Sequence, residues 1–193
     1  LLVNISLMLL WGIQHSVMAR SWFKDMIASV VPHHVERSTY CLVSAIVLAI
    51  LMYCWQPMAG LVWQVESPMI VKVLWGLFVV GWVLVLMATF LTNHFDLFGL
   101  RQSWLYFCQK TYTPVVFTEI LVYRWIRHPM MTGLLIAFWA IPTMTVGHLV
   151  FSTGMSIYVL IGIYFEEKSL AKQLGQHYID YQRRTKRLFP KFY

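Results

Sequence analysis

Residues 127–167 read RHPMMTGLLIAFWAIPTMTVGHLVFSTGMSIYVLIGIYFEE, and the expected fold follows from this stretch. Its interior, Met130–Phe165, contains no Asp, Glu, Lys or Arg. At a rise of about 1.5 Å per residue, one unbroken helix of this length would far exceed a hydrocarbon core about 30 Å thick. Pro142 and Gly147 lie near the middle of the run, and both residue types favour a turn there. The stretch therefore predicts a helical hairpin over 131–165.

The charged residues at the two ends of this hairpin are expected to meet. A hairpin returns Glu166-Glu167 to the membrane face that carries Arg127-His128. Pro129 suits the first turn of a helix, where its missing N–H would be unpaired anyway. A helix N-terminus favours anions, and a guanidinium matches a carboxylate or phosphate. Together these groups could hold a zwitterionic ligand with hydroxyl groups. The alternative is an ordinary membrane-boundary arginine followed by a solvated helical turn.

The composition places the chain in a membrane. Hydrophobic residues make up 59% and charged residues 12%, whereas soluble domains average about 45–50% and about 25%. The net charge of +7 could suggest nucleic acid. However, the cations lie in loops beside apolar segments, which is typical of membrane topology and of contact with anionic lipid headgroups. We therefore expect membrane lipids, and no nucleic acid, as partners. The sequence carries no signal for an oligomeric state.

Five apolar segments can be placed, at about 1–18, 40–55, 73–91, 131–141 and 148–165. We expect all of them to be helices, because lipid offers backbone polar groups no other partners outside a closed barrel. The predicted fold class is an all-α integral membrane protein with about five transmembrane helices, including the C-terminal hairpin, plus a cytoplasmic C-terminal helix. The chain, 1–193, is expected to form a single membrane-embedded domain. Further sequence is expected upstream, because the first segment begins at Leu1.

The distribution of positive charge predicts the orientation. Every Lys and Arg except Lys72 falls between the first two segments, in the loop 92–130 or in the tail 166–193. The positive-inside rule makes these segments cytoplasmic. The loop 92–130 is long and rich in aromatic residues, which favours a functional role over disorder. The basic run Arg183–Arg187 is interpreted most simply as a lipid-headgroup patch.

Two further groups could carry chemistry. Tyr178 and Tyr181 are three residues apart, so one helix face presents both, for ligand contact or for membrane-boundary anchoring. His94, Asp96 and Arg101 follow the third apolar segment, and His15 lies near the end of the first. Ionisable residues near membrane depth are candidates for function. The commoner alternative for any one histidine is a buried ring satisfied by a hydrogen bond.

The sequence predicts no metal site. Cys41, Cys54 and Cys108 form no C-x-x-C pair, so they indicate neither a disulfide framework nor a cysteine metal site. His33-His34 are adjacent, which is not a ligand spacing. A haem site could use His15, His94 or His148, but no spacing supports a particular pair.

These residues resemble a known family. The motifs that carry the resemblance are Arg127-His128-Pro129-x-x-x-Gly133, Glu166-Glu167-x-x-Leu170, Gly175-x-x-Tyr178-x-x-Tyr181 and Pro190. They are similar to those of the isoprenylcysteine carboxyl methyltransferase-like family, whose members are integral membrane enzymes that use S-adenosylmethionine. Four more blocks resemble the bacterial methanethiol S-methyltransferase subgroup: 14–20, 36–40, 93–102 and 142–148. Met131 departs from the pattern, because relatives often carry Tyr there.

The resemblance implies a function and a set of site residues. It implies S-adenosylmethionine-dependent conversion of methanethiol to dimethyl sulfide, in the inner membrane of a bacterium. It places the cofactor against these residues: Tyr123, Arg127, His128, Pro129, Glu166, Glu167, Tyr178 and Tyr181. The guanidinium suits the methionine carboxylate, a carboxylate suits the ribose hydroxyls or the ammonium group, and aromatic rings can face adenine or the sulfonium.

Methylation of a thiol requires the thiolate, because the thiolate is the nucleophile. We expect the cluster of His94, Asp96 and Arg101 to favour that form, with His15 as the second candidate. Two alternatives remain open at the level of sequence. One is a related methyltransferase for a prenylcysteine or phospholipid acceptor, which would need an open lateral groove. The other is a non-catalytic membrane protein that binds haem or serves in assembly.

Overall fold

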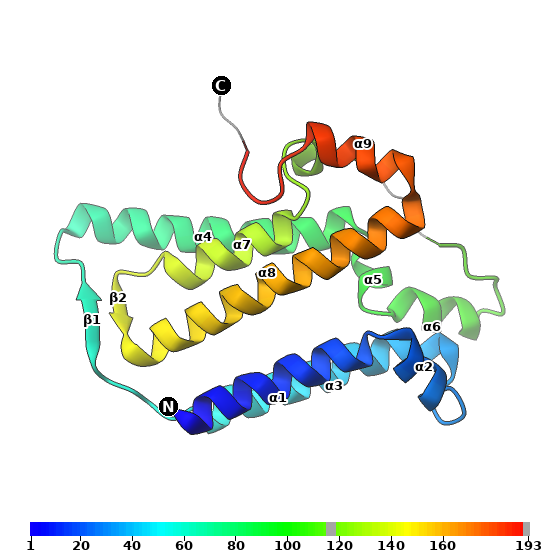
Figure 1. Cartoon of the computed structure of the whole chain (residues 1–193), viewed down its shortest axis with the longest axis horizontal. Coiled ribbons are helices and arrows are strands. Elements are labelled where there is room, and N and C mark those ends of the chain that lie inside the picture. The colour runs from blue at the N-terminus through cyan, green and yellow to red at the C-terminus, as the bar shows by residue number, and fades with distance from the viewer. Residues whose placement is uncertain (115–118, 191–193) are drawn as a thin grey trace. The chain divides into compact units, whose positions relative to one another are not determined.

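A computed structural model describes residues 1–114 and 119–190 (Figure 1). The described residues divide into two compact units, one made of 1–58 and 92–114, the other of 59–91 and 119–190. Positions 115–118 of the predicted loop and 191–193 of the predicted tail lie outside the described residues. Both units are built almost entirely from helices, which confirms the all-α class. The sequence reasoning holds here because the apolar segments leave the backbone no partner but itself.

The first unit contains five helices: α1 (Leu2–Met18), α2 (Ser21–Ile27), α3 (His33–Cys54), α5 (His94–Leu97) and α6 (Leu100–Phe107). Helix α1 packs along α3. Their contact is closed at one end by Asn4, which is fully buried. The Asn4 amide donates to the carbonyl of Gln56 at 2.8 Å and accepts from the Gln56 N–H at 2.8 Å. These paired bonds fix the start of α1 to the end of α3.

The second unit contains the predicted hairpin. Its elements are β1 (Leu61–Gln64), α4 (Pro68–Leu91), the 3-10 turn η1 (Leu121–Arg124), α7 (Pro129–Trp139), β2 (Thr143–Thr145), α8 (Val146–Leu174) and α9 (Gln176–Arg184). Helices α4, α7 and α8 run side by side (Figure 1). His148 ties the two arms of the hairpin together, because its Nε2 lies 2.9 Å from the Phe138 carbonyl oxygen. The predicted turn near Pro142 and Gly147 is therefore confirmed.

A short sheet at the hairpin turn was not predicted. Strands β1 and β2 pair antiparallel, with Trp63 opposite Met144. The Val65 N–H donates to the Pro142 carbonyl at 2.9 Å, and the Val146 N–H donates to that of Gly60 at 2.7 Å. A turn near membrane depth needs partners for its backbone, and β1 supplies them. Three or four residues are too few for an alternating pattern to stand out in the sequence.

Two helix boundaries differ from the prediction. Helix α3 begins at His33 and not near residue 40, because hydropathy locates the apolar part of a helix and not its first turn. Helix α8 does not end at Phe165 but continues through Glu166-Glu167 to Leu174. The residues after Phe165 include Glu, Lys, Leu and Ala, all good helix formers. Gly175, at φ +60°, ends the helix.

The number of helices able to cross a membrane alone is smaller than predicted. Among the described residues, α3, α4 and α8 are long and apolar enough, and the pair α1 and α2, bent by 79°, gives a fourth if it counts as one span. Helix α7 has 11 residues, or about 16 Å, roughly half of a hydrocarbon core. The chain is a multi-pass membrane protein, but the first arm of its hairpin is too short to span by itself.

Two glycines bring α4 and α7 into close contact. A Cβ atom on Gly81 would lie 2.7 Å from the Gly133 carbonyl oxygen and 2.9 Å from the Ala137 nitrogen. Small residues of this kind let membrane helices approach backbone to backbone. Because α7 carries Arg127-His128 just before its first turn, this contact also fixes the position of those residues against α4.

We expect Gly81→Ala to lower the free energy of unfolding by about 1–3 kcal/mol, because the added methyl group would overpack a contact with main-chain atoms. Gly76→Ala in the same helix is the matched control, since a Cβ there has no neighbour within 4 Å. Chemical unfolding in mixed micelles gives the free energy of unfolding of both variants. Equal stability of the two variants would contradict the close packing.

Candidate functional site

The chain segment after α9 lies alongside the segment that leads into α7. Ile126 and Lys186 form a parallel bridge. The Arg127 N–H donates to the Lys186 carbonyl at 2.8 Å, and the His128 N–H donates to that of Arg187 at 3.1 Å. Thr132, in the first turn of α7, donates through its hydroxyl to the Leu188 carbonyl at 2.6 Å. The segment 185–188 therefore becomes part of the site at the start of α7.

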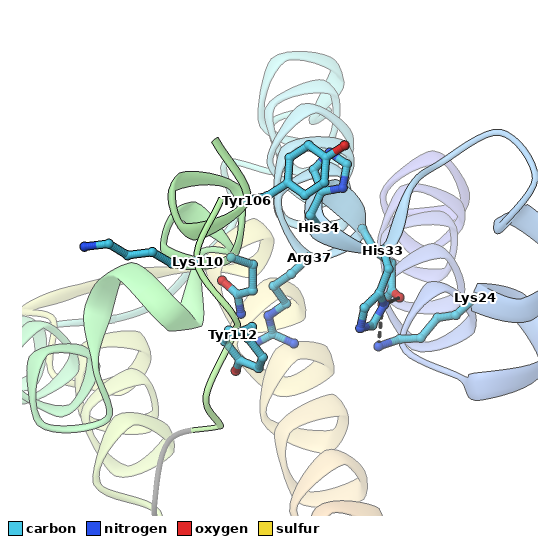
Figure 2. Close-up of a pocket in the computed structure, with 9 residues that line it drawn as sticks. Lys24, His33, His34, Arg37, Tyr106, Lys110 and Tyr112 are labelled. Carbon is cyan, nitrogen blue, oxygen red and sulfur yellow. Dashed lines mark hydrogen bonds and ion pairs between the residues drawn. The ribbon is translucent and has the colours of Figure 1, made fainter. Parts of the chain in front are cut away.

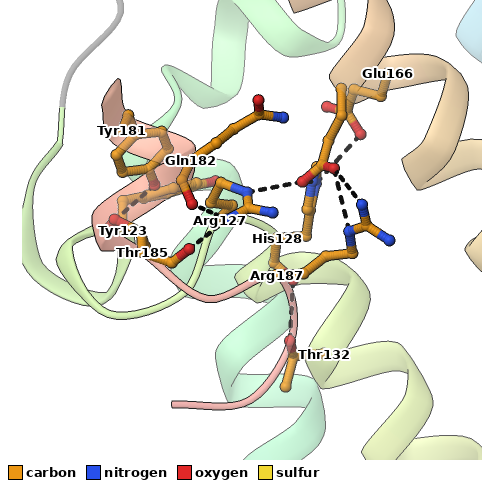
Figure 3. A network of polar contacts seen from close by, with 10 residues as sticks. Tyr123, Arg127, His128, Thr132, Glu166, Tyr181, Gln182, Thr185 and Arg187 are labelled. Carbon is orange, nitrogen blue, oxygen red and sulfur yellow. Dashed lines mark hydrogen bonds and ion pairs between the residues drawn. The ribbon is translucent and has the colours of Figure 1, made fainter. Parts of the chain in front are cut away.

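Glu167 is the centre of the site, and Figure 3 labels the three side chains that contact it, Arg127, His128 and Arg187. Its Oε1 accepts from Arg127 Nε at 2.7 Å and lies 3.2 Å from His128 Nε2. Its Oε2 accepts from Arg187 Nη2 at 2.8 Å and Nε at 3.1 Å. The Glu167 side chain is only 6% exposed. The predicted meeting of Arg127-His128 with Glu166-Glu167 is therefore confirmed.

Arg127 serves the protein's own backbone as well as Glu167. Its Nη1 donates to the carbonyl oxygen of Gln182 at 3.0 Å and to that of Thr185. These carbonyls lie in and just after the last turn of α9, where a cation is favourable. The Arg127 side chain is 8% exposed. In this structure the guanidinium thus joins α7, α8 and α9.

Two charged side chains of the site remain open to solvent. The Glu166 side chain is 48% exposed, and its Oε2 lies 3.4 Å from His128 Nδ1. The Arg187 side chain is 54% exposed, although it also binds Glu167. An accessible carboxylate and an accessible guanidinium thus flank a buried ion cluster. Both therefore present polar atoms to a ligand at the surface of the site.

The tyrosines of α9 are buried and hold the helix in place. Tyr178 and Tyr181 are each 1% exposed, with ring centroids 5.8 Å apart. The Tyr181 hydroxyl donates to the Tyr123 carbonyl at 2.6 Å, which ties α9 to η1. Burial raises the pKa of Tyr178 to about 12 and that of Tyr181 well above its ordinary value. Both phenols are therefore neutral hydrogen-bonding groups at physiological pH.

Sequence reasoning missed the part that the basic run plays. Arg187 binds Glu167, and Arg184 Nη2 lies 2.6 Å from both carboxylate oxygens of Glu119. At least two cations of the predicted headgroup patch are thus used inside the unit. A signal was present, since the paired Glu166-Glu167 need more positive charge than Arg127 alone provides. Which basic residue would supply that charge depended on the fold of the segment after α9.

The residues predicted to act on the thiol lie in the first unit. Arg101 Nη1 donates to Asp96 Oδ1 at 3.0 Å, and the Tyr112 hydroxyl donates to Oδ2 at 3.2 Å. The His94 ring packs on that of Phe98, with centroids 4.8 Å apart. The structure thus joins Asp96 to Arg101, while His94 has an aromatic neighbour.

His15 lies apart from that cluster, between α1 and α3. Its Nε2 is 2.8 Å from the Tyr40 hydroxyl, and its Nδ1 is 3.1 Å from Ser44 Oγ. The ring also stacks on Trp11, with centroids 5.0 Å apart. A histidine held by two hydroxyl groups can exchange a proton without a carboxylate partner.

Comparison with known proteins gives close matches along almost the whole chain. The profile of the family described as NnrU protein matches residues 3–189. The methanethiol S-methyltransferase of Mycobacterium tuberculosis is 46% identical over 188 residues, which cover 97% of this chain and 77% of the relative. That of Pseudomonas deceptionensis is 47% identical, over 98% of this chain and 72% of the relative. Nurim of Xenopus laevis is 27% identical, over 81% and 58%. No solved structure matches significantly.

We expect Glu167→Gln to destabilise the protein by about 3–5 kcal/mol, because it would leave the buried Arg127 without its counter-charge. Glu166→Gln, one residue earlier and half exposed, is the control and should cost less than about 1 kcal/mol. Chemical unfolding in micelles gives the free energy of unfolding of both variants. A Glu167→Gln protein as stable as the control would mean that the cluster does not hold the helices together.

Proposed function

Because the chain belongs to the NnrU protein family and is 46–47% identical to two methanethiol S-methyltransferases, we propose that it methylates methanethiol to dimethyl sulfide. The observation that carries this proposal is the extent of the match, 97–98% of the chain. We propose that the whole chain, 1–193, works as one membrane-embedded methyltransferase domain. A prenylcysteine or phospholipid acceptor and a haem-binding role are not favoured by these relatives.

We propose S-adenosylmethionine as the methyl donor. When bound, it would supply a methyl group activated by attachment to a positively charged sulfur. The accessible pair at the site fits its amino-acid part, because one group is anionic and the other cationic. Arg187 would bind the carboxylate, and Glu166 would bind the ammonium group or the ribose hydroxyls. In this proposal the two exposed residues, Arg187 and Glu166, contact the ligand.

The other predicted cofactor residues would act by positioning. Arg127, His128 and Glu167 form the buried cluster from which Glu166 and Arg187 project. Pro129 begins α7 directly after Arg127-His128, so the helix starts next to the buried cluster. The contacts among Tyr123, Tyr178 and Tyr181 hold α9 against η1. Preorganisation of this kind places the binding groups without further ordering when the ligand arrives.

We propose that residues of the first unit help to generate the thiolate. A small thiol is mostly protonated at neutral pH, so a base or a nearby cation favours the reactive form. Arg101 can stabilise the anion, with Asp96 holding its guanidinium. His94 and, as the second candidate, His15 can take the proton. Both oxygens of Asp96 already accept hydrogen bonds, which suits it to holding Arg101.

The bacterial relatives support a location in the inner membrane, and the charge distribution supports a cytoplasmic position for the site. In the second unit Lys72 lies in the first turns of α4. The cations of α8, α9 and the segment before α7 lie at the opposite end of the helices (Figure 1). The positive-inside rule then makes the C-terminal end cytoplasmic, where a soluble, charged cofactor is available.

The decisive test is to supply the purified protein with S-adenosylmethionine and methanethiol and to measure dimethyl sulfide in the headspace. We expect product only when both substrates are present, and thermal stabilisation by S-adenosylhomocysteine. Stabilisation without product would refute the acceptor. A folded preparation with neither response would refute the methyl donor.

A second test separates ligand contact from positioning. We expect Glu166→Gln to raise the KM for S-adenosylmethionine about tenfold, the loss expected for one hydrogen bond to a charged group, while the melting temperature stays near that of the parent. Asp180→Asn, which alters an exposed carboxylate of α9, should leave this KM unchanged. An unaltered KM in Glu166→Gln would remove Glu166 from the proposed contact.

A further inference from the structure

We propose that a cationic pocket in the first unit binds the phosphate of an anionic phospholipid whose headgroup carries hydroxyl groups. This inference does not depend on methyl transfer. The pocket has a volume of 490 Å³ and lies where α2, the start of α3 and α6 come together (Figure 2). Lys24, Arg37 and Lys110 line it, together with the paired histidines His33-His34.

The charge of the pocket suits a phosphate. Glu36 is the carboxylate among its lining residues, and its two oxygens are already engaged, at 2.6 Å from Lys24 Nζ and 3.3 Å from His33 Nδ1. Arg37 uses Nε for the Leu97 carbonyl, at 2.8 Å. Lys24 and Arg37 against one carboxylate leave the pocket positive before any histidine is protonated, and Lys110, whose side chain points away from them in Figure 2, adds positive charge at its edge. The beginning of α3 adds the positive end of a long helix dipole.

A second observation points to a ligand with hydroxyl groups. Gln102 lines the pocket, and its Nε2 donates to the Asp96 carbonyl at 3.2 Å. Its Oε1 is buried and has no hydrogen-bond partner within the described part of the chain. A buried acceptor without a donor is costly, and such groups commonly mark an absent water or ligand. A headgroup hydroxyl can supply the donor, whereas phosphate oxygens alone cannot.

The surroundings of the pocket identify the source of the phosphate as a lipid. Helix α2 is bent by 79° from the membrane helix α1 and exposes Trp22 and Met26. On α6, which also lines the pocket, Trp104 and Phe107 are 64% and 77% exposed. Exposed aromatic and apolar groups at the end of a membrane helix lie at the level of lipid headgroups. A polar cavity flanked by such groups suits a headgroup with its acyl chains alongside.

The test measures retention of phosphatidylglycerol by the full chain in phosphatidylcholine nanodiscs, using native mass spectrometry after mild delipidation. We expect Lys110→Gln to weaken retention about fivefold, as expected for one cation near an anionic lipid, and Lys110→Arg to preserve it. Arg37→Gln should weaken retention by a similar factor. Because Arg37 also donates to the Leu97 carbonyl, that variant could lose structure as well, so the Lys110 variants decide the outcome. Gln102→Leu should weaken phosphatidylglycerol more than phosphatidic acid, which lacks the headgroup hydroxyls.

Arg183→Gln in α9 removes the same charge from an exposed position of the second unit and is the matched control. If it weakens retention as much as Lys110→Gln, general surface charge explains the effect and the pocket proposal fails. Inorganic phosphate that stabilises the parent against heat, in the absence of any preference for phosphatidylglycerol, would overturn the lipid assignment. Equal retention of phosphatidylglycerol and phosphatidylcholine by the parent would do the same.

Discussion

The second unit depends on the need to neutralise a buried carboxylate. Glu167 lies in α8 directly after the apolar run, its side chain is only 6% exposed, and burying its charge unpaired would be far too costly. Three side chains from two separate parts of the chain meet this need: Arg127 and His128 from the start of α7, and Arg187 from the segment after α9. Because each part must reach the same two oxygen atoms, one carboxylate determines how α7, α8 and the C-terminal segment lie together.

This constraint separates residues that are available to a ligand from residues that hold the site together, a distinction that the sequence alone does not show. Adjacent residues Glu166 and Glu167 point to different environments, so one is available to a ligand and the other is not. Arg127 was expected to recognise a carboxylate of the ligand, but the carboxylate that it binds belongs to the protein. A family motif can therefore combine a residue that contacts a ligand with others that hold it in position.

The sequence predicts best those features that a single continuous stretch of residues determines. The charge-free stretch broken by Pro142 and Gly147 predicts a hairpin because lipid leaves no alternative, and the match to methanethiol S-methyltransferases confirms the motif-based resemblance. The end of α8 was missed because hydropathy marks the membrane, whereas Gly175 ends the helix. The roles of β1 and Arg187 depend on pairings across the fold, which no local pattern contains.

The bonds of the segment 185–188 to the residues around the start of α7 have a consequence for biosynthesis. Arg187 is made after α4, α7 and α8, so Glu167 still lacks one of its cationic partners when the residues of the hairpin have been synthesised. The ion cluster closes only when Arg187 has left the ribosome. Until then the Glu167 carboxylate lacks both hydrogen bonds that Arg187 donates, so the ends of the hairpin are held together by fewer contacts than in the finished chain.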